Sequence, residues 1–438
     1  MHYLPVHRRW LRPVLVITAA AAALLGAGVL LVPRHADKPA PASAPASSEL
    51  DRYVTRTTDH LTKVPGDWQG WAQLGMAQVQ LARITADPSH YPPAETALRR
   101  SLTVQPHGNA AALTGLGALA AARHNFHEAF RYAHSAVATD AFSADAYGVL
   151  TDACVELGRY PEATAAVQRM LDLRPDTGSF GRASYVFELS GNRNRATELM
   201  QRALDVAGSP ADATFALTHL GELAFNEGDL DKAAGYFARG LARTPGQPAL
   251  LADRAKVSAA RGDYASALDD LRAATAVLPT VDHLVTLSDT LTAAGRPGEA
   301  ATIDTLIRAT TRLPGATGAT TDIDLVLFYA DRGEPGTAVA KARALFAARP
   351  SVSVETAYAW ALHAAGRDRE ALTHADRGLR LGTKDARAHY QRAQIRRALG
   401  DRRGARADLS EALALNPYFS LRNAPRARTE LASLEGPA

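Results

Sequence analysis

An internal repeat of roughly 34 residues constrains this chain more than any other feature of its sequence. One alanine recurs at the same position of ten consecutive segments, namely Ala94, Ala129, Ala163, Ala196, Ala233, Ala267, Ala300, Ala338, Ala371 and Ala405. Only 6% of the residues are aromatic, and abundant alanine favours closely packed helices over sheets. A single unit of this length cannot bury its apolar face, so neighbouring units are expected to stack into one continuous core.

Glycine and proline mark the ends of the two helices expected in each unit. A glycine stands five residues before the alanine in eight units, where it frees the backbone for a turn: Gly158, Gly191, Gly228, Gly262, Gly295, Gly333, Gly366 and Gly400. A proline, which cannot continue a helix, follows the second helix in six units: Pro106, Pro175, Pro245, Pro279, Pro350 and Pro417.

The residues Trp71-x-x-Leu74-Gly75-x-Ala77, and the Leu-Gly pairs at 116–117 and 220–221, resemble the tetratricopeptide repeat family. The resemblance is to a membrane-anchored bacterial, actinobacterial-like member. It implies an all-α, right-handed superhelical solenoid of antiparallel helix pairs, with about ten units over residues 68–418. Helices over 49–66 and 419–438 are expected to cap the two ends, as solenoids require.

Three insertions interrupt the period. They fall around residues 84–91, near Ser209 and within 313–318. The last lies between the two least regular units, so the array is either one continuous superhelix or broken near 312–318.

The N-terminal segment has the pattern of a membrane signal. Residues 1–12 carry Arg8, Arg9 and Arg12, and residues 13–33 contain a long uncharged apolar run, which predicts a single span with the N-terminus inside. A secretory signal that is cleaved is the alternative. Residues 34–48 are rich in Pro, Ala and Ser and are expected to form a tether to an extracytoplasmic repeat domain.

The charge distribution argues against nucleic-acid binding by the bulk of the chain. Residues 1–38 hold five basic side chains and one acidic one, which accounts for the whole net charge of +4. Ten arginines against three acids between Arg387 and Arg428 make the C-terminal end basic. This end is either a solvated solenoid terminus or a surface for an acidic partner or anionic headgroups.

We expect no catalytic residue, no cofactor, no metal site and no small-molecule substrate. Gly115-x-Gly117-x-x-Ala120 matches a dinucleotide motif but falls inside an expected helix. His124 and His127 lack a third ligand, and Cys154 occupies an apolar position of its unit. His219 and Glu222 share a helix face and are expected to form a solvated or groove-facing pair.

The family resemblance implies that positions two, five, nine and twelve of each first helix line a concave groove. Some of these side chains could instead pack on the next helix. The candidate partner-binding residues at these positions are Phe215, Glu222, Phe225, Trp360, His363, Arg387, Tyr390, Gln394 and Arg397. Thr218, Ser353 and Thr356 share the register, whereas the Lys/Asn set that clamps a C-terminal carboxylate in some family members is not visible.

The sequence therefore predicts a non-catalytic, membrane-tethered scaffold that binds a peptide or protein partner in its groove. An accessory or assembly factor of a membrane transport or cell-envelope system is the alternative. A self-assembling structural array and an enzyme are further classes.

Overall fold

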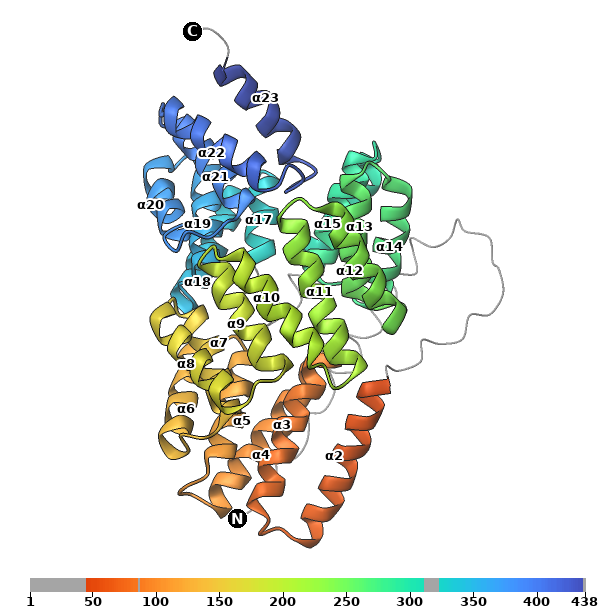
Figure 1. The fold of residues 1–438 in the computed structure, drawn as a ribbon, viewed down its shortest axis with the longest axis vertical. Coiled ribbons are helices and arrows are strands. Elements are labelled where there is room, and N and C mark those ends of the chain that lie inside the picture. Colours follow the sequence, from red (N-terminus) through yellow and green to blue (C-terminus); the bar gives the residue numbers. More distant parts are fainter. Residues whose placement is uncertain (1–44, 86, 311–322, 436–438) are drawn as a thin grey trace, which may run out of the picture. The chain divides into compact units, whose positions relative to one another are not determined.

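The computed structural model describes residues 45–85, 87–310 and 323–435, and these residues fold into helices. They form 22 α-helices and one short 3₁₀-helix, with no strand within the described ranges (Figure 1). The described residues from Ala46 onward make up one compact unit.

Ten antiparallel helix pairs follow one another along the chain between a first helix and a last helix. The first is α2 (Pro45–Lys63) and the last is α23 (Asn423–Glu435). The pairs are α3 (Trp68–Thr85) with α4 (Tyr91–Val104), α5 (Ala110–Ala122) with α6 (Phe126–Thr139), α7 (Ala144–Glu156) with α8 (Tyr160–Leu173), α9 (Thr177–Leu189) with α10 (Arg193–Asp205), α11 (Pro210–Asn226) with α12 (Leu230–Arg243), α13 (Pro248–Ala260) with α14 (Tyr264–Val277), α15 (Val281–Ala293) with α16 (Pro297–Thr310), α17 (Ile323–Asp331) with α18 (Pro335–Ala348), α19 (Val352–Ala364) with α20 (Asp368–Gly378), and α21 (Ala386–Ala398) with α22 (Arg402–Leu415).

The recurring alanine lies in the second helix of every pair and is buried there. Nine of the ten side chains are 0% exposed, and Ala300 is 4% exposed. The first helices contribute small residues as well: a Cβ added to Gly75 would run into Leu98 and lie 3.0 Å from the Ala94 carbonyl oxygen, and one added to Gly221 would run into Phe237. Close approach of the two helices in a pair therefore depends on side chains that are small on both sides.

The turn between the two helices of a pair has one recurring backbone conformation. All eight predicted turn glycines have positive φ, from 69° at Gly158 to 83° at Gly262. His124 occupies the same place in the second pair and is the one positive-φ residue other than glycine among those described, with φ 58°. Each of the six predicted prolines lies two residues after the end of a second helix.

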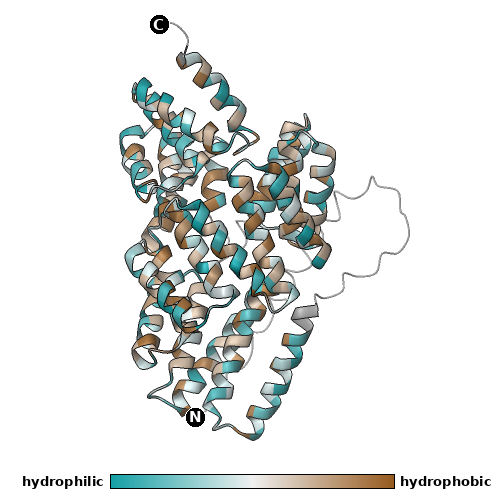
Figure 2. Ribbon diagram, in the orientation of Figure 1, coloured by the Kyte–Doolittle hydropathy of each residue, from teal (hydrophilic) through white to brown (hydrophobic). Residues whose placement is uncertain are grey.

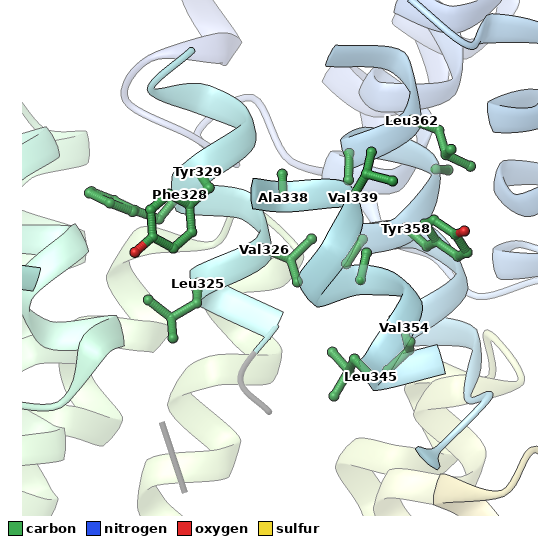
Figure 3. Packing of buried hydrophobic residues seen from close by; sticks show 14 of the residues in the cluster. Leu325, Val326, Phe328, Tyr329, Ala338, Val339, Leu345, Val354, Tyr358 and Leu362 are labelled. Carbon is green, nitrogen blue, oxygen red and sulfur yellow. The ribbon is translucent and has the colours of Figure 1, made fainter. Parts of the chain in front are cut away.

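The hydrophobic core runs from pair to pair as a series of contiguous clusters. Figure 3 shows one of them, in which Leu325 and Phe328 of α17, Leu345 of α18 and Val354 of α19 lie together. Hydrophobic and hydrophilic residues alternate along the helices, as expected where one face is buried and another is wet (Figure 2).

A set of long-range contacts joins the third, fourth and fifth pairs to the eighth, ninth and tenth. We call this set the seam. Glu156 accepts from Arg349 at 3.1 Å, and the Tyr160 hydroxyl accepts from the Val352 N–H at 2.7 Å. Further along the seam, Asn416 Nδ2 donates to the Phe225 carbonyl at 2.9 Å. The two partners of each contact lie more than 190 residues apart in sequence.

Two features expected from the sequence lie outside the described residues. These are the N-terminal segment, with its basic residues 1–12, its apolar run within 13–33 and residues 34–44 of the expected tether, and the insertion at 313–318. Within the part of the chain that the structure describes, no helix is both long and apolar enough to cross a bilayer.

Candidate functional site: a groove lined by the first helices

A groove of about 1430 Å³ is lined mainly by residues of the first helices of the pairs, from Met76 in α3 to Gln391 in α21. In α9 the lining includes Gly178, Gly181, Tyr185 and Glu188, which are positions two, five, nine and twelve of that unit. The repeat register thus places regularly spaced side chains on one common surface.

Four of the nine candidate residues line this groove. They are Phe215, Glu222 and Phe225 of α11 and Arg387 of α21. Ser353 and Thr356 of α19 line it as well, whereas Thr218 does not.

The other five candidates lie outside the groove, engaged with other parts of the chain. Trp360 Nε1 donates to Asp331 at 2.8 Å, and His363 hydrogen-bonds with Asp368. Tyr390 is only 3% exposed and its ring centroid lies 5.5 Å from that of Phe419.

The remaining two candidates contact the last helix, α23. Gln394 and Arg397 both contact Glu430 of α23, the latter at 2.8 Å. Tyr390 is buried because α23 and the segment before it cover this surface, which matches the alternative in which such a side chain packs on the next helix. A role for these five residues in partner binding stays a prediction.

The groove lining is rich in carboxylates. Twelve acidic side chains stand against seven basic ones among the described residues that line it. The acids are Asp145, Asp152, Glu156, Glu188, Asp212, Glu222, Asp253, Asp282, Asp289, Asp324, Asp331 and Asp385. The bases are Arg83, Arg182, Arg193, Lys256, Arg332, Lys384 and Arg387.

Several of these charges are already paired across neighbouring helices. The Arg182 guanidinium donates two hydrogen bonds, of 2.8 and 2.9 Å, to the two oxygens of the Asp152 carboxylate, in the fork geometry that suits a carboxylate. Arg332 donates to Asp289 and to Asp304 of α16, each at 2.8 Å. These pairs fix helix to helix and leave an excess of acid in the groove.

Burial raises the pKa of several carboxyl groups in the groove lining. It raises the pKa of Glu156 and Asp331, and it raises the pKa of Asp253 to about 6, although the nearby Lys256 ammonium opposes the shift. Burial also raises the pKa of Glu188, and the negative charge of Glu222 adds to the effect. A nearby carboxylate adds to the rise in pKa at each of the others as well: Asp152 at Glu156, Asp289 at Asp331, and Glu222 and Asp282 at Asp253.

The sequence motifs that could have indicated cofactor binding or a reactive thiol lie in packed helices. Gly115 and Gly117 lie inside α5, so no strand-to-helix phosphate turn forms there. Cys154 is fully buried, and burial raises the pKa of its thiol to about 11, which keeps it a thiol near neutral pH. No group of three metal-binding side chains occurs within the ranges described.

None of the nine candidate residues lies on α9 or α13, although both helices contribute side chains to the groove lining. The register that located Phe215 and Glu222 also selects Tyr185 and Glu188 in the preceding unit, so the signal was present. The same register also selects Lys256 on α13, as position nine of its unit. Its contact with Asp253 lies within α13, whereas its contact with Asp282 depends on the packing of α13 against α15, which the register does not give.

The fold and groove define an array of helix pairs of the α-solenoid class. Two segments match models of the tetratricopeptide repeat, over residues 190–248 and residues 386–419. The matches support the family resemblance carried by the glycine, alanine and proline positions. No match was found among the curated proteins.

Solved structures with similar helix arrangements include a thermophilic tetratricopeptide repeat protein of Thermus thermophilus. It is 24% identical, with 46% of this chain and 98% of that chain covered and a TM-score of 0.37. PilW, a type IV pilus biogenesis factor, is 15% identical over 49% of this chain and 98% of its own, with a TM-score of 0.41. YrrB, a repeat protein with an unusual peptide-binding site, is 21% identical over 43% and 97%, with a TM-score of 0.31.

Proposed function

We propose that this chain is a non-catalytic interaction scaffold that binds a peptide or protein partner in the groove of its helix pairs. The groove itself carries the proposal. Its 1430 Å³ exceeds the roughly 300–1,000 Å³ of small-molecule pockets, and its lining extends over successive repeat units, which suits a polymer segment.

The proposal includes a location. The apolar run within 13–33 anchors the chain in a membrane with residues 1–12 inside, and the tether at 34–48 presents the repeats on the extracytoplasmic side. Cleavage of the segment as a secretory signal is the alternative. A tethered scaffold of this kind would suit an accessory role in a membrane transport or envelope system.

Site-specific photo-crosslinking tests the groove as the binding surface. A photoreactive residue replaces Thr286, which lines the groove on α15, or Thr302, an exposed residue of α16 in the same unit outside the lining. The full chain is irradiated in cells that produce it, and the adducts are identified by mass spectrometry.

We expect a defined partner to crosslink at position 286 and not at position 302. Equal crosslinking at both positions, or no adduct at either, would contradict binding in the groove. The matched pair controls for expression and folding, because both threonines belong to the same helix pair.

A further inference from the structure

One part of the groove leaves aromatic rings and carboxylates together on two adjacent helices. We call it the α9–α11 wall, and it consists of Tyr185 and Glu188 on α9 and Phe215, His219 and Glu222 on α11. The spacing along each helix puts these side chains on one face. Tyr185 is 44% and Phe215 is 37% exposed, and they are the two exposed large hydrophobic residues that line the groove among those described.

The ring of Phe215 is held in place without being buried. A Cβ at Gly181 would lie 2.8 Å from Phe215 Cε1, so the ring lies against bare backbone of α9. His219 contacts it edge-on with ring centroids 4.5 Å apart. Tyr185 lies near Ser353 of α19, and both residues line the groove. The wall therefore offers fixed aromatic surface, which loses little side-chain entropy when a ligand covers it.

Carboxylates flank these rings. Glu222 is hydrogen-bonded to His219 at 2.6 Å, and Glu188 is near enough to Glu222 for the two negative charges to oppose each other. The adjoining surface of α13 already holds one ammonium group: Lys256 Nζ lies 3.1 Å from Asp253 and 3.7 Å from Asp282. An added cation would relieve the repulsion that remains.

The chain contains an internal example of the arrangement that such a wall would form with arginine. The guanidinium of Arg159 lies 4.0 Å from the ring centroid of Phe130 while it pairs with Glu162 at 2.7 Å. A guanidinium can stack on a ring and hydrogen-bond a carboxylate at the same time, because it is planar and its donors lie at its edge.

A second observation, on α21, also indicates a missing donor. The side chain of Gln391 on α21 is 3% exposed and lines the groove, yet its buried Oε1 has no hydrogen-bond partner. A buried acceptor left unpaired costs about 1–3 kcal/mol, which a ligand donor would recover.

We propose that the groove binds an extended segment of a basic protein, with an arginine or lysine side chain of that segment held on the α9–α11 wall between its aromatic rings and carboxylates. This inference rests on the proposed scaffold function and adds the chemistry of the partner. Because acids outnumber bases in the groove lining, positive charge is also favoured along the rest of the bound segment.

The test measures binding of synthetic peptides to the full chain, purified in mild detergent, by fluorescence anisotropy. The probe is a labelled Ala/Ser peptide that carries spaced arginines. One comparison peptide has citrulline at those positions, which keeps the shape and removes the charge, and another has glutamate.

The variant E188Q/E222Q removes the wall's two glutamate charges with nearly unchanged volume. E198Q is the matched control, because Glu198 is an exposed residue of α10 outside the groove that pairs with Arg195 and Arg202. Phe215→Leu removes the ring and keeps an apolar side chain. Circular dichroism melts establish that each variant folds.

We expect the arginine peptide to bind and the citrulline and glutamate peptides to bind at least about tenfold more weakly. E188Q/E222Q should weaken arginine-peptide binding by about tenfold, Phe215→Leu by several-fold, and E198Q not at all. No binding of the arginine peptide, equal binding of the citrulline peptide, or unchanged binding to E188Q/E222Q would each overturn the proposal.

Failure here is distinguishable from failure of the scaffold function. If position 286 crosslinks a partner whose contacting segment lacks arginine and lysine, the scaffold stands and the basic partner is wrong. If position 286 crosslinks nothing, the scaffold itself fails.

Discussion

At the scale of single residues, the alanine column has no room for a larger side chain. Ala267 is 0% exposed and lies in the cluster formed by α13, α14 and α15. Replacement by leucine forces three extra carbons into a close helix contact, and overpacking of this kind costs about 1–3 kcal/mol.

We expect Ala267→Leu to lower the free energy of unfolding by that amount in denaturant titration. Ala265→Leu is the control, because Ala265 is exposed on the same helix and its replacement should stay within about 0.5 kcal/mol of the parent. Equal effects of the two substitutions would show that the column does not set the helix spacing.

Two titrating groups, Glu188 and His219, make the charge of the α9–α11 wall depend on pH. The pKa of Glu188 is raised by burial and by Glu222, so Glu188 takes up a proton at a higher pH than an ordinary glutamate. Burial alone would lower the pKa of His219, but the hydrogen bond and charge of Glu222 raise it overall above the ordinary value. Acidification from neutral pH therefore neutralises one group and makes the other positive.

Both changes reduce the negative charge of the wall, so binding of the arginine peptide should weaken as the pH falls from about 7.5 to about 5.5. Anisotropy titrations across that range measure the effect. In E188Q/E222Q the dependence should flatten, since one titrating group is removed and His219 loses its partner. An affinity that rises on acidification would contradict the assignment of these groups.

At the scale of helices, α23 completes the core of the last pair. Tyr390 of α21 packs against Phe419 and belongs to a cluster that includes Ala424 and Ala427 of α23. Tyr390→Ala should therefore cost about 3 kcal/mol or more of stability, with lost amide protection in α21 to α23.

Tyr418→Ala is the matched control, because Tyr418 is half-buried in the groove lining and its loss should cost about 1 kcal/mol. Thermal unfolding followed by circular dichroism compares the two. A stable Tyr390→Ala variant that binds a partner less well would instead restore Tyr390 to the binding surface.

The helices themselves were predictable from the sequence because their signals are local. The alanine, the turn glycine and the terminal proline each act within one unit, and the structure confirms all three. The positions of Trp360 and Tyr390 were not predictable in the same way. Their surroundings depend on Asp331 in another unit and on α23, and a repeat register says nothing about either.

At the scale of the whole molecule, the proposed topology makes a direct prediction. If residues 13–33 span the membrane with 1–12 inside, protease added to intact cells should cut the tether between 34 and 48 and release the repeats. Immunoblotting of the released fragment measures this. Protection of the repeats until the membrane is permeabilised would contradict the orientation.

The seam makes this chain differ from a simple linear solenoid, in which each unit affects only its neighbours. Tyr160 at the start of α8 accepts a hydrogen bond from the Val352 N–H at the start of α19. Tyr160→Phe removes the hydroxyl and nothing else, and leaves that N–H without its acceptor. Tyr264 holds the same repeat position at the start of α14. It takes no part in the seam contacts of Glu156, Tyr160 and Asn416.

Hydrogen exchange followed by mass spectrometry should therefore show faster exchange around residues 350–356 in Tyr160→Phe, although the substitution lies more than 190 residues away. Tyr264→Phe should leave that segment unchanged. Because exchange reports local opening, the first pair, α3 with α4, should keep its protection in both variants. Unchanged exchange at 350–356 in Tyr160→Phe would mean that the seam contributes nothing to stability, and that the units respond only to their neighbours in the sequence.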